Sequence, residues 1–328
     1  MPGIRFLVTN IVAIRPVLYA SILIATLVAT YAFKLRTQGI FACPASGYPA
    51  DGYLGYCNAS AYGDYDHGAL WFGMEAEAEQ HAANADVLFI GNSRMQFGFS
   101  SAATAEWFVA AGASDYLLGF SHLENETFAA PLLARIKPRA RVYVINVDRF
   151  FDDEESAPGA AILRGSDMQR RYSEKRLWQR LHRPLCTRLP RLCGQELAFY
   201  RFRQDGHWLA RGGGPAHPQP VADADPSERE QWEHYATLAR QFVSKLPVDR
   251  KCVILTVVPS PATKRAEARA ISAALGLELI EPQPEGLQTF DETHLSVLSA
   301  QRWSSAFFDA AGPQIRQCLA GTPVTPAG

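Results

Sequence analysis

The sequence has no excess of charge of either sign, because 32 Lys and Arg residues balance 33 Asp and Glu residues to a formal net charge of −1. Proteins that bind the phosphate backbone of nucleic acid carry a strong positive excess, so the composition argues against a nucleic-acid partner. No dinucleotide-binding or phosphate-cradling glycine motif follows a predicted strand. The scattered histidines lack the paired spacing of metal ligands, and we therefore predict no metal and no cofactor.

Charged residues are missing from Val17 to Phe33, an apolar run bounded by Arg15 and Lys34. A helix of this length spans roughly 25 Å, close to the ~30 Å hydrocarbon core of a bilayer. We therefore predict a transmembrane helix over about residues 16–33, within an anchor segment of residues 1–36. A cleaved signal peptide and a buried helix of the body are the alternatives. Large residues follow the run where signal cleavage requires small ones, which favours the anchor.

Six cysteines are present, and two pairs are close in sequence: Cys43 with Cys57, and Cys186 with Cys193. An even count with close pairs is typical of an oxidising compartment, although the sequence leaves the disulfide partners open. No Lys or Arg occurs from Thr37 to Asn92, which suits a translocated segment. We predict a single-pass protein of the inner membrane, with its body outside the cytoplasm and in the periplasm of a Gram-negative host.

Beyond the anchor, short apolar runs alternate with helical stretches, the pattern of a parallel sheet with helices on both faces. Apolar residues make up 48% of the chain, enough for a large core. We predict an α/β fold: a three-layer α/β/α, flavodoxin-like domain over residues 85–328, preceded by an extracytoplasmic linker segment at 37–84. The predicted strands cover residues 87–90, 116–118, 141–147, 251–258 and 277–280, and the predicted helices cover 102–111, 127–136, 229–245, 262–275 and 296–310.

An insertion at about residues 149–226 interrupts this pattern, and its centre is basic. From Arg164 to Arg211 there are twelve Lys or Arg and four Asp or Glu, so charge is segregated along the chain. One interpretation is a lid that recruits an anionic glycan or lipid headgroup. The other is a solvated helical subdomain with charged outer faces. A flexible return loop is predicted from Gly212 to Pro226.

A serine stands where the first predicted strand ends. Ser93 follows the 87–90 run within the tetrapeptide GNSR. A rigid strand would fix its hydroxyl, and nearby main-chain N–H groups could receive negative charge. Serine at this place is also typical of a turn or a helix cap. Arg94 and Gln96 are expected to cap or line the pocket.

An acid and a histidine follow the last predicted strand, directly before the closing helix. Asp291 and His294 lie three residues apart in the tetrapeptide DETH. A turn at this spacing lets the carboxylate accept a hydrogen bond from the imidazole, which orients the ring and stabilises its charged form. His294 would then activate Ser93.

On these residues the chain resembles the SGNH, or GDSL-type, hydrolase superfamily. In that family a nucleophilic serine follows the first strand in a GDS or GNS context, and a DxxH motif near the carboxy end supplies the acid and the base. The GNSR and DETH tetrapeptides occupy those positions in that order. The resemblance covers roughly residues 85–312, apart from the insertion. It implies catalytic roles for Ser93, Asp291 and His294.

The resemblance also implies an oxyanion hole made by the main-chain N–H of Ser93, a glycine after the second strand and an asparagine after the third. Gly119 matches the glycine. The third block departs from the family's GxND pattern, since residues 144–148 read VINVD. We assign Asn146 as the donor, shifted in register, with a simple turn as the alternative interpretation. If Asp148 took that place, its carboxylate would face the developing oxyanion and oppose catalysis.

These features predict a membrane-anchored serine esterase or O-acyltransferase, with an acyl ester and the membrane as its partners. The resemblance implies an envelope polysaccharide as the carrier of the ester. A non-catalytic envelope protein that uses the fold for binding or assembly is the competing hypothesis, and the altered third block favours it. A lipid-active enzyme at the membrane surface is the third.

Overall fold

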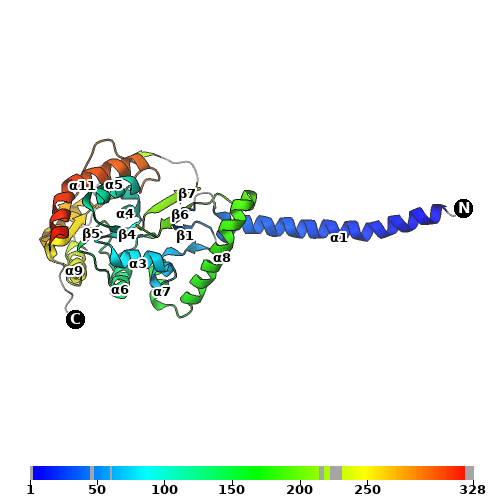
Figure 1. Cartoon of the computed structure of the whole chain (residues 1–328), viewed down its shortest axis with the longest axis horizontal. Helices are drawn as coiled ribbons and strands as arrows, with labels where there is room; N and C mark the ends of the chain where they lie inside the picture. Colours follow the sequence, from blue (N-terminus) through cyan, green and yellow to red (C-terminus); the bar gives the residue numbers. More distant parts are fainter. Residues whose placement is uncertain (1–2, 45–47, 60, 214–217, 222–230, 322–328) are drawn as a thin grey trace.

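The computed structural model describes residues 3–44, 48–59, 61–213, 218–221 and 231–321. Helix α1 (Gly3–Thr37) leaves the rest of the chain as a long extension (Figure 1). Its segment Pro16–Lys34 is apolar and long enough to cross a membrane, and none of it is buried against the body. The predicted apolar helix is confirmed, and a buried core helix is excluded. A signal sequence meets the same criteria of length and composition.

A five-stranded parallel sheet forms the centre of the body and confirms the predicted α/β fold. Each strand corresponds to a predicted one, with ends shifted by a few residues. β3 lies between β5 and β4, so the carboxyl ends of these three strands are neighbours. The strand order is β10 (Leu279–Ile280), β9 (Val253–Thr256), β5 (Val142–Asn146), β3 (Val87–Asn92) and β4 (Asp115–Phe120), and every pairing is parallel.

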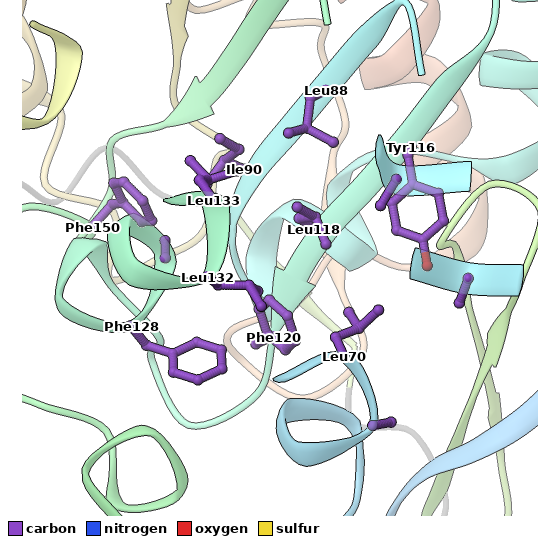
Figure 2. Close-up of a cluster of buried hydrophobic side chains, with 14 of the residues drawn as sticks. Leu70, Leu88, Ile90, Tyr116, Leu118, Phe120, Phe128, Leu132, Leu133 and Phe150 are labelled. Carbon is purple, nitrogen blue, oxygen red and sulfur yellow. The ribbon is translucent and has the colours of Figure 1, made fainter. Parts of the chain in front are cut away.

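Helices cover both faces of this sheet, because successive side chains of a strand point to opposite sides. In β3, Leu88 and Ile90 join one hydrophobic cluster, whereas Val87 and Phe89 join the other. Figure 2 shows part of the first cluster, to which Phe128, Leu132 and Leu133 of α6 contribute. That side carries α3 (Ala76–Asn84), α6 (Glu126–Ile136), α9 (Trp232–Val243) and α10 (Arg265–Leu275), and the other carries α4 (Ser93–Gly98), α5 (Ser101–Ala111) and α11 (Val297–Ala320).

The closing helix α11 is longer than predicted, because it continues through Pro313 to Ala320. Proline removes one N–H donor from a helix and usually ends it. Here the buried side chains of Ile315 and Cys318, beyond the proline, keep the helix on the sheet. A disulfide from Cys318 to Cys252 ties its last turns to the 3-10 helix η4 (Arg250–Cys252).

All six cysteines form disulfides. Cys43 pairs with Cys57, which joins the end of the 3-10 helix η1 (Gly39–Ala42) to strand β1 (Gly52–Cys57). Cys186 pairs with Cys193 across the turn that follows helix α8 (Met168–Arg188). The two close pairs of the sequence are thus bonded to each other, and the remaining two cysteines form the long-range bond.

A second, antiparallel sheet joins the segment after the anchor to the insertion. Residues 37–84, expected to be a linker, contribute two strands that pair with each other, and one of them also pairs with a strand of the insertion. Sequence patterns missed this sheet because its strands are short and one carries a register irregularity between Leu54 and Tyr56. The order is β2 (Gly63–Asp64), β1 (Gly52–Cys57), β6 (Ala198–Phe202) and β7 (Trp208–Arg211), and the short helix α2 (Asp66–Trp71) follows β2.

Arg201 of β6 connects the second sheet to the edge of the first. Its side chain is fully buried and pairs through two nitrogens with the carboxylate of Asp66 at 2.6–2.9 Å. The guanidinium also donates to the carbonyls of Leu117 and Gly119 in edge strand β4. A buried cation is tolerated only with such complete pairing, so Arg201 fixes how the two sheets meet.

The rest of the insertion is helical, with α7 (Ala157–Arg164), the long α8 (Met168–Arg188) and the 3-10 helix η2 (Pro190–Leu192). Figure 1 shows α8 at the end of the body from which α1 leaves. A short pairing of β8 (Gln219–Pro220) with β11 (Gln288–Thr289) brings the insertion back beside the DETH segment. Most of the return loop predicted from Gly212 to Pro226, at residues 214–217 and 222–226, lies outside the described residues.

Candidate active site

Ser93 is the first residue of α4, directly after the fully buried strand β3. Asn92 caps this helix, because its side-chain oxygen accepts a hydrogen bond of 3.0 Å from the main-chain N–H of Arg94. The other end of the Asn92 amide donates to the carbonyl of Asp148 at 2.9 Å. The helix start is therefore tied to the chain that follows β5. Ser93 itself is 9% exposed, so its hydroxyl is held in a fixed place.

The DETH segment folds as predicted and meets Ser93 from the other end of the domain. Nδ1 of His294 lies 2.7 Å from Oδ2 of Asp291, and Nε2 lies 2.8 Å from Oγ of Ser93. Glu292 has a left-handed φ of 69°, which lets the chain turn back on itself. The second oxygen of Asp291 accepts the main-chain N–H of His294 at 2.8 Å. The three predicted residues form one continuous hydrogen-bonded chain.

Asp291, the acid of the hydrogen-bonded series, stays ionised. Partial burial would raise the pKa of Asp291, but the hydrogen bond and charge of His294, together with two main-chain N–H groups, outweigh that effect and lower the pKa. A carboxylate in this position stabilises the imidazolium that forms when His294 accepts a proton.

Two aromatic rings hold the imidazole of His294 in place. Phe97 lies with its ring centre 4.7 Å away, and Phe290 stacks on the imidazole at 5.8 Å. Phe97 in turn contacts Phe199 and Trp208 of the second sheet, with ring centres 5.3 and 6.0 Å away. The second sheet thus provides an aromatic wall beside the candidate triad.

Asp148 forms a buried ion pair with Arg94. Asp148 is 1% exposed and Arg94 is 3% exposed, so each charge is neutralised inside the protein. Arg94 was expected to cap or line the pocket, and it instead binds this carboxylate. Because Arg94 neutralises Asp148, this carboxylate does not place an unpaired negative charge at the oxyanion position.

Asn146 is buried at the end of β5, and half of its amide has no partner among the described residues. Its side-chain oxygen accepts a hydrogen bond of 3.1 Å from the N–H of Val258. This contact fixes which way the amide points. Its nitrogen is buried and makes no hydrogen bond to the described part of the chain. A buried N–H without a partner is costly, so it is available to a bound group.

Gly119 lies within β4 rather than in a loop after it. A Cβ here would come within 2.9 Å of the main-chain oxygen of Asn92, so close approach of the two strands requires glycine. Gln96 donates to the carbonyl of Gly119 at 3.0 Å, and to those of Leu117 and Gly206. Gln96 therefore binds main-chain carbonyls around β4 instead of lining a pocket.

Ser121 is a candidate residue that sequence reasoning missed. In the sheet register Asn92 aligns with Phe120, so the residues that follow them, Ser93 and Ser121, leave the sheet side by side. Ser121 is 7% exposed, and its hydroxyl has no partner among the described residues. Two left-handed residues follow, His122 and Leu123 with φ of 61° and 54°. Strained backbone of this kind is concentrated at functional sites.

A buried ionic cluster lies beside the end of β4. His67 is fully buried, with Nδ1 2.7 Å from Asp64 and Nε2 2.6 Å from Glu124. Burial disfavours the charged imidazole, but the two carboxylates outweigh it and raise the pKa of His67 to about 10. Spacing along the chain does not indicate this cluster, since Glu124 is 57 residues away from His67.

One group of residues within the described part of the chain has metal-ligand geometry: His182, Cys186 and Cys193. The two cysteines form a disulfide, so their sulfurs are not thiolate ligands in this state. His182 bonds the hydroxyl of Tyr48 and the carbonyl of Cys43 at 3.0 and 3.1 Å. Its surroundings explain it as a structural residue.

A cavity of about 860 Å³ lies at the opposite end of the parallel strands from the triad, between α6, α9 and the end of α11. It contains none of the predicted site residues.

No protein-family model, curated protein or solved structure matches the chain.

Proposed function

We propose that the protein is a membrane-anchored serine esterase or O-acyltransferase of the SGNH type, with a flavodoxin-like α/β/α domain. The observation that carries this proposal is the hydrogen-bonded chain from Asp291 through His294 to Ser93, which joins residues 201 positions apart. Gly119 and Asn146 lie near the carboxyl ends of β4 and β5, the two strands beside β3, although Gly119 is within its strand and not after it as the resemblance implies.

In the proposed reaction, Oγ of Ser93 attacks the acyl carbonyl while Nε2 of His294 accepts the hydroxyl proton. His294 then returns this proton to the departing alcohol oxygen, which leaves an acyl group on Ser93. Water completes hydrolysis, or a sugar hydroxyl completes acyl transfer, with His294 as the base in both cases. The main-chain N–H of Ser93 and the free amide N–H of Asn146 donate hydrogen bonds to the carbonyl oxygen as it becomes negatively charged.

The location and the substrate class belong to the same proposal. The apolar helix α1 supports a single-pass anchor in the inner membrane, and the three disulfides support a body in an oxidising compartment such as the periplasm. The partly exposed ring of Phe97 beside His294, backed by the buried rings of Phe199 and Trp208, offers an apolar surface to a sugar ring. We therefore propose an ester of an envelope polysaccharide as the substrate.

A fluorophosphonate probe tests whether Ser93 is activated. We expect the full-length protein to be labelled, and the Ser93→Ala and His294→Ala variants to remain unlabelled, because the probe requires a nucleophilic serine with its base. Ser101→Ala is the matched control, since Ser101 is exposed on α5, and it should be labelled like the wild type. A folded wild-type protein that takes up no label would favour the non-catalytic binding or assembly hypothesis.

Asn146→Asp tests the proposed oxyanion donor. The aspartate keeps an oxygen for the N–H of Val258 but loses the amide N–H. We expect kcat for ester cleavage to fall by at least about 10²–10³-fold, because the usual cost of removing one oxyanion donor is joined by a carboxylate charge that opposes the developing oxyanion. Thermal unfolding serves as the control for folding. A kcat close to that of the wild type would assign the hole to other donors, with Ser121 the first to replace.

A further inference from the structure

An exposed apolar stripe runs along α8. Leu177, Leu181 and Leu185 follow one another at four-residue spacing and are 58%, 45% and 39% exposed. Trp178 lies beside them and is 47% exposed, and Leu189 continues the stripe at the end of the helix. Residues four apart lie on one face of a helix. A continuous exposed apolar face on an otherwise globular body marks an interaction surface.

The opposite face of α8 is fixed to the body, so the helix cannot rotate to hide this stripe. Gln179 on that face is buried and bonds both the N–H and the carbonyl of Leu54 in β1, at 3.1 and 2.8 Å. His182 and Cys186 are buried on the same side. The orientation of the leucine stripe is thus set by polar contacts that only one rotation of the helix satisfies.

The stripe is continuous with the apolar segment of α1. An apolar groove of about 510 Å³ lies between the two, lined by Leu185 and Leu192 on one side and by Leu27, Val28 and Tyr31 of α1 on the other. Leu27 lies seven residues before Lys34, where the apolar segment ends, which corresponds to about 10 Å of helix. If α1 crosses a bilayer, the end of α8 reaches the boundary between headgroups and acyl chains.

Arginines lie along the same helix. Arg180 and Arg188 lie beside the stripe, Arg176 and Arg183 lie farther round the helix, and Arg191 follows near its end. The guanidinium of Arg183 lies over the ring of Tyr48. Within the described part of the chain none of these five forms an ion pair with a carboxylate. Amphipathic helices that lie in the membrane interface combine an apolar face with unpaired basic residues that attract anionic lipids.

We propose that α8 is an interfacial membrane helix that inserts its leucine stripe into the leaflet from which α1 emerges and binds anionic phospholipid headgroups through its arginines. This inference rests on the proposed anchor. It gives the basic insertion a role in holding the body at a fixed orientation to the membrane, instead of a role as a lid over the triad. The body is then held by two contacts rather than by one flexible stalk.

Photo-crosslinking of the full-length protein in lipid nanodiscs tests this inference. The photoreactive residue p-benzoylphenylalanine is placed at Leu181 on α8, at Ile24 on α1, or at Val109, which is 82% exposed on α5. With phosphatidylglycerol-containing nanodiscs, we expect lipid adducts from Leu181 and Ile24 but not from Val109. Adducts from Ile24 without any from Leu181 would overturn the inference and leave the anchor intact. No lipid adduct from either position would overturn both.

Protein adducts in place of lipid adducts at Leu181 would show that a second copy or another protein covers the stripe, and would also overturn the inference.

The contribution of the arginines to lipid binding is tested by Arg176→Gln, Arg180→Gln and Arg183→Gln together. We expect these changes to reduce the adduct yield at Leu181 in anionic nanodiscs to the yield in purely phosphatidylcholine nanodiscs. The matched control removes three exposed arginines elsewhere on the body. It combines Arg240→Gln, Arg250→Gln and Arg302→Gln, and it should leave the adduct yield at Leu181 unchanged.

Discussion

Replacing Ser93 by alanine is expected to lower kcat for ester cleavage by a factor of about 10⁴ to 10⁶, the usual cost of removing a triad nucleophile. The side chain is small, and its hydroxyl bonds only His294 among the residues that the structure describes, so the fold should be retained. Steady-state turnover of acetyl and long-chain p-nitrophenyl esters measures the effect. A preference for the long-chain esters would favour the lipid-active alternative over polysaccharide deacylation.

The Ser93→Ala/His294→Ala double variant tests whether the two residues act as a unit. Triad residues are strongly non-additive, because either loss alone disables the same step. We therefore expect the double variant to be about as inactive as either single one, and Asp291→Asn to lose roughly 10⁴-fold by disturbing the tautomer of His294. The proposed mechanism would be contradicted if the loss in the double variant were the product of the two single losses, or if the Ser93→Ala protein kept substantial turnover.

His67 is expected to make stability depend on pH between about 6.5 and 10. Its ordinary pKa is 6.5, and the carboxylates of Asp64 and Glu124 raise it to about 10 in the folded protein against the opposing effect of burial. The folded state therefore holds a proton that the unfolded state releases above pH 6.5. Its stabilising contribution is complete below pH 6.5 and is lost as pH rises through 10, by on the order of 5 kcal/mol in total.

Thermal unfolding of the wild type and of His67→Gln across this pH range measures the contribution. The destabilisation caused by the variant should be largest near pH 6 and should shrink towards pH 10. Asp115 and Glu126, whose pKa values burial raises to about 8, titrate in both proteins and cancel in the difference. A destabilisation that is constant with pH would show that His67 is uncharged.

His182→Gln is the matched control for this experiment. His182 is also buried among aromatic rings, but burial lowers its pKa to about 4, and the hydrogen bond with the carbonyl of Cys43 offsets this only in part. It is neutral in the folded and unfolded states at alkaline pH. The cost of His182→Gln should therefore not change from pH 7.5 to pH 10.

Local sequence patterns were sufficient to predict the strands of the main sheet and the residues of the candidate triad. The five strands were predicted because each is a short apolar run next to a helical stretch. Asp291 and His294 were predicted to contact each other because only three residues separate them. Their meeting with Ser93 followed from the chain order, since both segments come after strands of one parallel sheet.

The sequence by itself thus determined the apolar helix, the parallel sheet and the three residues of the candidate triad, because each depends on spacing along the chain. The tertiary structure decided which polar groups are paired and which stay free. Asp148 is neutralised by Arg94, 54 residues away, and Gln96 bonds carbonyls of β4 and the insertion. It also decided that β1 pairs with β6 and that the leucine stripe of α8 faces outward. Buried charges and strand edges take whichever partners the packed chain brings within hydrogen-bonding distance, and sequence spacing does not encode that choice.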